Sequence, residues 1–110
     1  MLVRVFVVCA RVSPSMAGRA PDAHVVKAYS TLSWETIRDP RFGGESATAF
    51  ICGDDLAAKA TVMGLSSELG LDVADVGPLA ETARLEMMVL LYIALARSYG
   101  RNIAFKLLRR

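Results

Sequence analysis

Apolar runs alternate with breaker residues along the whole chain, and this alternation predicts short strands and helices. Four runs rich in β-branched and apolar residues predict strands, at residues 2–8, 24–29, 47–52 and 71–76. Proline and glycine pairs separate these runs, and the Arg-Phe-Gly-Gly segment at residues 41–44 predicts a loop.

Two helices are predicted between the strands by their capping residues. Ser33 can cap a short helix at residues 34–38, and Asp54 can cap a longer one at residues 55–69, because their side-chain oxygens accept hydrogen bonds from free backbone amides. The strand–helix–strand order at residues 47–76 is typical of a βαβ unit with parallel strands. The predicted fold class is α/β: a small, mostly parallel sheet with a βαβ unit and a long apolar C-terminal helix.

The last predicted helix, at about residues 80–99, is apolar on every face from Met87 to Ala96. Such a helix must be covered on all sides, and one small sheet covers only one of them. We therefore expect a homodimer or higher oligomer. Its contacts are expected from Met87, Leu90, Leu91, Ile93 and Leu95. Coverage by the N-terminal strand and the helix after Ser33 is the alternative, and membrane insertion is not expected, because the run is too short to span a bilayer.

Composition and charge narrow the classes of protein. The chain has 110 residues, of which 54% are hydrophobic and 22% charged, as in one globular domain. Cys9 and Cys52 lie in apolar runs, which favours reduced, buried thiols and a cytoplasmic location. The net charge is +2, and the basic residues of the last fourteen positions are typical of a solvated helix end. Nucleic-acid binding is therefore the weaker reading of these residues.

Familiar catalytic motifs are absent from the sequence. It has no G-x-G-x-x-G, no P-loop and no nucleophile elbow. His24 is the single histidine, and no Cys-x-x-Cys is present, so no metal site is expected. Asp54 and Asp55 are adjacent, and they cannot face one another as an acid/base pair. We expect no catalytic residue in this chain.

An ordered series of segments nevertheless resembles a known family. The segments are VVKAYSTLS (25–33), DPRFGG (39–44), TAFICGDDLAAKATV (48–62), LGLDVADVGPL (69–79) and GRNIAFKLLRR (100–110). The series resembles the C-terminal half of the NADP oxidoreductases that use a deazaflavin coenzyme. It is similar also to the cytosolic domain of the six-transmembrane metalloreductases. The resemblance covers residues 15–110 as one domain and leaves residues 1–14 as an N-terminal strand of uncertain origin.

The resemblance implies a cofactor site. In that family a glycine-rich Rossmann half binds NADP, and the C-terminal part completes the hydride-transfer cleft and contributes to dimerisation. The implied cofactor-binding residues are Ala28, Tyr29, Ser30, Thr31, Gly77 and Pro78. Lys27 to Thr31 match the family's K-A-F-N-T stretch, except that Ser30 stands where the family has asparagine.

The missing glycine loop decides the functional expectation. Its backbone amides would cradle the pyrophosphate, so NADP binding by this chain alone is not expected. We expect a truncated oxidoreductase-family domain that acts as a small-ligand-binding or protein-interaction module and does not catalyse alone. The alternative is an NADP/deazaflavin oxidoreductase whose site is completed by a dimer or by a separate Rossmann partner.

Overall fold

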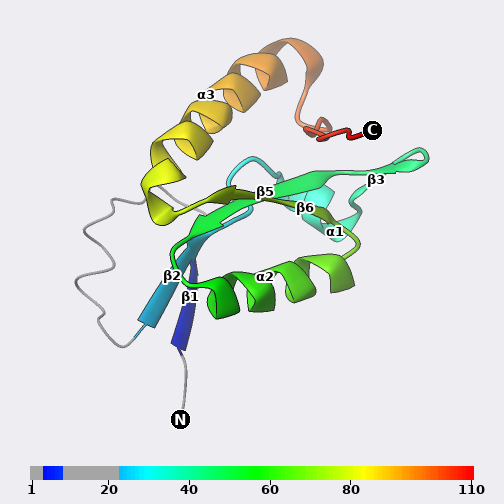
Figure 1. Ribbon diagram of the computed structural model, residues 1–110. Helices are drawn as coiled ribbons and strands as arrows, with labels where there is room; N and C mark the ends of the chain where they lie inside the picture. Colours follow the sequence, from blue (N-terminus) through cyan, green and yellow to red (C-terminus); the bar gives the residue numbers. More distant parts are fainter. Residues whose placement is uncertain (1–3, 9–22) are drawn as a thin grey trace.

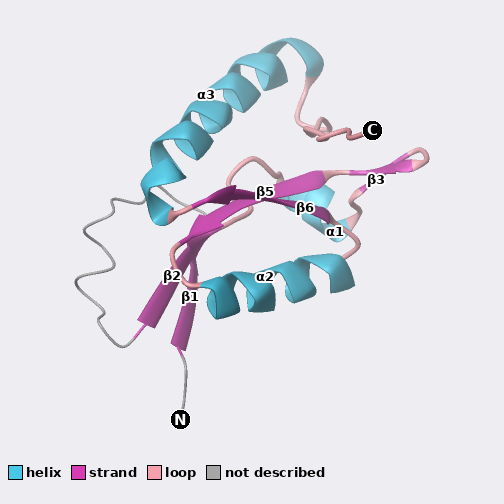
Figure 2. Ribbon diagram, in the orientation of Figure 1, coloured by secondary structure: helices cyan, strands magenta, loops and turns pink. Residues whose placement is uncertain are grey.

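The computed structural model describes residues 4–8 and 23–110, and it builds them into one mixed sheet with helices on both faces (Figure 1). The four-stranded sheet has the order β1-β2-β5-β6. Its strands are β1 (Arg4–Val8), β2 (Ala23–Lys27), β5 (Thr48–Gly53) and β6 (Asp72–Gly77). The helices are α1 (Trp34–Arg38), α2 (Leu56–Glu68) and α3 (Thr82–Tyr99), the last preceded by the 3₁₀ turn η2 (Leu79–Glu81). The strand, helix and loop segments are distinguished in Figure 2.

The α/β class and the βαβ unit are confirmed. Strands β5 and β6 precede and follow α2 in the sequence, and they pair with each other in parallel. Strand β1 pairs in parallel with β2. The middle pairing is antiparallel, with Val26 opposite Gly53 and Lys27 opposite Cys52. The sheet is therefore mostly parallel, but its two halves run in opposite directions.

Side chains alternate between the two faces of the sheet, as the pleat requires. On the α2 face, Val26 and Ile51 pack with Ala58 and Val62 of the helix in one buried cluster. On the opposite face, a second cluster joins the sheet to η2 and α3. Its buried members are Val25, Cys52, Leu79 and Leu85. Ala58 and Ser66 are small and buried, and they let α2 lie close to the strands, whereas Ala57, Ala60 and Gly64 face solvent.

Two local predictions are corrected. Residues 41–44 were expected as a loop, but β3 (Arg41–Phe42) and β4 (Glu45–Ser46) form a small antiparallel hairpin. Gly43 makes its turn possible because it adopts a φ of 67°, a left-handed conformation that costs glycine little. The cap of α2 is also Asp55 and not Asp54: the Asp55 carboxylate accepts a hydrogen bond from Ala58 N at 2.8 Å. Ser33 caps α1 as expected.

The residues after α3 return to the sheet. Thr48 N donates to Phe105 O at 3.0 Å, and Leu107 N donates to the Thr48 hydroxyl at 3.1 Å. Lys106 Nζ donates to Asp72 at 2.9 Å. The C-terminal segment is thereby fastened to the starts of β5 and β6. No helix in the described part of the chain is long and apolar enough to cross a membrane.

Candidate functional site

The segment that follows β2, expected to contact a cofactor, is mostly enclosed. Ala28 is fully buried and Thr31 is 3% exposed. Tyr29 has a φ of 63°, which is unusual for a residue with a side chain. The Ser66 hydroxyl donates to Val62 O at 2.8 Å, so the Tyr29 hydroxyl donates to Ser66 Oγ, at 2.7 Å. This hydrogen bond ties the turn after β2 to α2, and both Tyr29 and Ser30 are half-buried.

The loop after β6, the second part of the expected site, is held by acidic and basic side chains. Lys59, which is 6% exposed, lies with its Nζ 3.0 Å from Asp75 Oδ2. Its ammonium also donates to Gly77 O at 3.4 Å, while Asp75 Oδ1 accepts from Gly77 N at 2.9 Å. Asp54 accepts from Leu79 N at 2.9 Å. The Gly-Pro-Leu loop is thus fixed to the end of β5 and to α2.

The two groups of predicted site residues begin side by side and then diverge: Lys27, at the end of β2, lies opposite Cys52 of β5, which lies opposite Gly77 of β6. Ligands favour the carboxyl ends of parallel strands. Because β2 runs antiparallel to β5, the chain that leaves β2 runs toward the start of β5, whereas Gly77 and Pro78 follow the ends of β5 and β6.

Two of the expected cofactor-binding residues are enclosed by the protein itself. Ala28 and Thr31 offer no accessible side chain. A Cβ at Gly77 would meet Glu81 Cγ at 3.7 Å, so the space beside this glycine is already partly filled. Of residues 28–31, Tyr29 and Ser30 are the two that are partly exposed.

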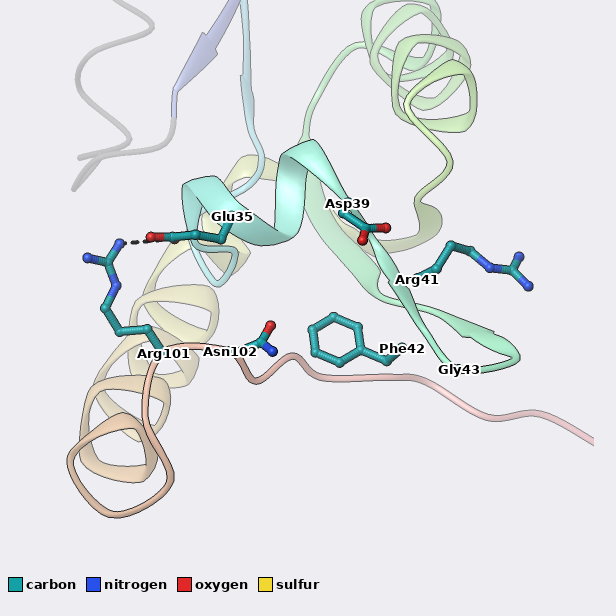
Figure 3. A pocket seen from close by; sticks show the side chains of 7 residues that line it. All are labelled: Glu35, Asp39, Arg41, Phe42, Gly43, Arg101 and Asn102. Carbon is teal, nitrogen blue, oxygen red and sulfur yellow. Dashed lines mark hydrogen bonds and ion pairs between the residues drawn. The ribbon is translucent and has the colours of Figure 1, made fainter.

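A polar depression of about 690 Å³ lies elsewhere, between α1, the hairpin and the residues after α3 (Figure 3). Its lining residues are Glu35, Asp39, Arg41, Phe42, Gly43, Arg101 and Asn102. Arg101 Nη2 lies 3.3 Å from Glu35 Oε2 and closes one side, while Arg41 extends away from the centre on the other. The backbone N–H at Glu35 and, less strongly, the Arg101 guanidinium lower the pKa of the Glu35 carboxyl. No pattern in the sequence predicted this depression, because its residues are up to 67 positions apart.

Other candidate chemistry is absent from the described residues. Cys52 is fully buried, and burial raises the pKa of its thiol to about 11, so it stays protonated and unreactive near neutral pH. No cluster of three or more potential metal ligands occurs between residues 23 and 110 or in β1. His24 Nδ1 lies 3.8 Å from Asp55 Oδ1, beside the cap of α2. Two of the basic residues near the C-terminus, Arg101 and Lys106, face carboxylates.

Comparison with known proteins supports the resemblance in the sequence. No family model matches the chain. Metalloreductase STEAP3 of Rattus norvegicus is 36% identical over 76 residues, which is 68% of this chain and 15% of that protein. A solved structure from Arthrobacter sp., assigned as an F420-dependent NADP-reductase, superimposes with a TM-score of 0.80 at 33% identity. That match covers 91% of this chain and 47% of the other.

A second solved structure, a hypothetical protein from Sinorhizobium meliloti, has a TM-score of 0.60 at 28% identity and covers 69% of this chain. The chain spans about half the length of both solved structures, 47% and 45%. The fold and the site segments define an α/β domain of oxidoreductase type. More particularly, the chain resembles one half of the reductases that use NADP and coenzyme F420, a deazaflavin, and it is related also to a metalloreductase.

Proposed function

We propose that this chain is a binding module of an NADP/deazaflavin-type oxidoreductase, and that it does not transfer hydride alone. The observation that carries the proposal is the shared fold with the Arthrobacter protein over 91% of this chain at 33% identity. That match covers 47% of the Arthrobacter chain, so the rest of a complete reductase would be supplied by other residues.

The rigid strand ends support a role in binding. The Lys59–Asp75 pair and the Asp54–Leu79 hydrogen bond fix the loop after β6, and the Tyr29–Ser66 hydrogen bond fixes the turn after β2. Pre-organised backbone lowers the entropic cost of binding a ligand or a protein partner. Within a complete site, we place the contact of this chain at Ser30, on the turn that Tyr29 holds.

The alternative is a complete enzyme whose site is finished by a second copy or by a separate dinucleotide-binding partner. Nucleic-acid binding has less support, because Arg101 and Lys106 of the basic C-terminal group are paired with Glu35 and Asp72. Phosphate recognition depends on basic side chains that face solvent together.

A titration distinguishes a binding module that is inactive alone from a complete enzyme. NADPH and then coenzyme F420 are added to the chain while NADPH fluorescence and the melting temperature are followed. We expect no rise in melting temperature, whereas tight binding would stabilise the fold by about 2.7 kcal/mol at a hundredfold excess over Kd. A clear rise, or reduction of F420 by NADPH with this chain alone, would contradict the proposal.

A fusion tests the positive part of the proposal. The half of the Arthrobacter protein that this chain does not match is joined to the full chain, and F420 reduction is followed by absorbance. We expect turnover in the fusion and its loss in Ser30→Trp, which fills the turn. Ser67→Trp, on the exposed side of α2, is the matched control and should keep the activity. A folded fusion without turnover would overturn the proposal.

A further inference from the structure

The polar depression between α1, the β3–β4 hairpin and the residues after α3 is a candidate ligand site of its own (Figure 3). Its volume of about 690 Å³ lies within the range of small-molecule sites in proteins, about 300–1,000 Å³. None of its lining residues is among those expected to contact NADP or a deazaflavin. A ligand bound here would therefore be additional to the proposed oxidoreductase role.

The walls of the depression are held in place by contacts with the rest of the molecule. Phe42 is half-buried and packs against the core cluster around Ala47. The base of the hairpin is closed by a hydrogen bond from Ala47 N to Pro40 O, at 2.8 Å. Beyond α3, the Tyr92 hydroxyl donates to Arg101 O at 2.9 Å. A ligand would thus meet preformed walls, which lowers the entropic cost of binding.

The charged groups around the depression are not equally available to a ligand. Arg101 Nη2 lies 3.3 Å from Glu35 Oε2, and these two charges offset one another. Arg41 donates to Gly44 O at 3.3 Å, and its side chain extends away from the centre (Figure 3). Among the described residues, by contrast, none bonds the Asp39 carboxylate. The charged group left for a ligand is therefore a negatively charged acceptor.

We propose that this depression binds a guanidinium group, with Asp39 as its ion-pair partner and Phe42 as the ring on which it stacks. A guanidinium is planar, its N–H groups match the two oxygens of a carboxylate, and its face stacks on aromatic rings. The Asn102 carboxamide, which faces the depression with the Phe42 ring in Figure 3, supplies a further acceptor oxygen. An anion fits less well, because Arg101 and Arg41 are already engaged and Asp39 would repel it.

Two probes distinguish the sources of such a group, a free small molecule and an arginine side chain of a protein. Agmatine represents the first, and the peptide acetyl-Gly-Arg-Gly-amide represents the second. Each is titrated into the isotope-labelled full chain, and we expect saturable NMR shifts of the Gly43 and Asn102 amides. The matched peptide acetyl-Gly-citrulline-Gly-amide has a similar shape without the charge. It should bind at least about fivefold more weakly, because a charge-assisted hydrogen bond is lost. The tighter of agmatine and the arginine peptide identifies the source.

Substitutions locate the binding. Asp39→Asn should weaken the tighter probe at least about fivefold and Phe42→Leu about threefold, because the first removes the charge and the second removes the ring. Glu68→Gln, at an exposed carboxylate of α2 outside the depression, is the matched control and should leave the affinity unchanged. The NMR spectrum of each free variant shows that it is folded.

Three results would overturn the proposal. The first is an Asp39→Asn variant that binds like the wild type, or a Glu68→Gln variant that loses as much affinity, because either places the cation on the general surface. The second is equal binding of the arginine and citrulline peptides. The third is a shift of the Gly43 and Asn102 amides with inorganic phosphate and with neither probe, which would make this an anion site.

Discussion

Lys59 is a charged residue buried inside this protein. Lys59 is 6% exposed, and its ammonium contacts both the Asp75 carboxylate and Gly77 O. The desolvation cost of a buried charge is offset only when a partner and further hydrogen bonds are present. Asp75 keeps about a third of its side chain in water, 35%, which moderates the cost of losing the pair.

We expect Lys59→Ala to lower the free energy of unfolding by about 2 kcal/mol, because it removes the partner of Asp75 and leaves Gly77 O with one hydrogen bond fewer. The matched control is Arg84→Ala, since Arg84 pairs with Glu81 at 3.1 Å but is 81% exposed. That exposed pair should contribute less than about 0.5 kcal/mol. Urea denaturation of the wild type and both variants measures these free energies of unfolding. Equal losses would show that burial of Lys59 does not strengthen its interaction.

At the scale of elements, the adjacent aspartates after β5 have separate structural roles. Asp55 caps α2 through Ala58 N, and Asp54 accepts from Leu79 N, 25 residues further along the chain. One carboxylate thus begins a helix and the other ties the end of β5 to η2. The sequence predicted a capping role here but assigned it to the wrong aspartate, because both residues suit the position.

Separate substitutions distinguish these two roles. Asp55→Ala should destabilise the protein by about 1 kcal/mol, whereas Asp55→Asn should retain most of the stability, because asparagine also caps helices well. In amide hydrogen exchange, Asp55→Ala should accelerate exchange at Ala58, and Asp54→Ala should accelerate it at Leu79. The assignment would be wrong if Asp54→Ala exposed Ala58 and left Leu79 protected.

At the scale of the whole molecule, the C-terminal segment closes the fold by contacts across the chain. Lys106 bonds Asp72 at 2.9 Å, and Arg101 pairs with Glu35 of α1 at 3.3 Å. The hydrogen bond from Lys106, with a smaller contribution from the Val73 N–H, lowers the pKa of the Asp72 carboxyl below 3.8. A carboxyl whose pKa is lowered by folding stabilises the fold above its ordinary pKa, and this stability is lost as the pH falls.

Acid should therefore loosen the C-terminal segment before the sheet unfolds. As the pH falls below the ordinary value of 3.8 for Asp72, the Leu107 amide, which donates to Thr48, should lose protection from exchange. Lys106→Met should produce the same loss at neutral pH. NMR-detected exchange measures both effects. Protection of Leu107 that is unchanged in Lys106→Met would show that this ion pair does not hold the segment.

Much of the fold was readable from the sequence, because its signals are local. β-branched runs identified the four strands of the sheet, Ser33 marked the start of α1, and the order of residues 47–76 indicated the parallel β5–α2–β6 unit. The apolar circumference of α3 likewise predicted that part of the helix would lack cover within one subunit, and Leu90 at 61% exposure agrees with this. Each of these features depends on residues a few positions apart.

The direction of β2 and the form of the candidate site were decided only by tertiary structure. The 20 residues between β2 and β5 are long enough for either a parallel crossover or an antiparallel return, so the sequence did not fix the choice. The antiparallel return turns the chain after Lys27 back along β5, although Lys27 itself lies in one row with Cys52 and Gly77. Lys59 with Asp75 and Tyr29 with Ser66 are likewise paired by packing, 16 and 37 positions apart. Such contacts form only when separate elements are brought together, because no local pattern of residues encodes which distant side chains will meet.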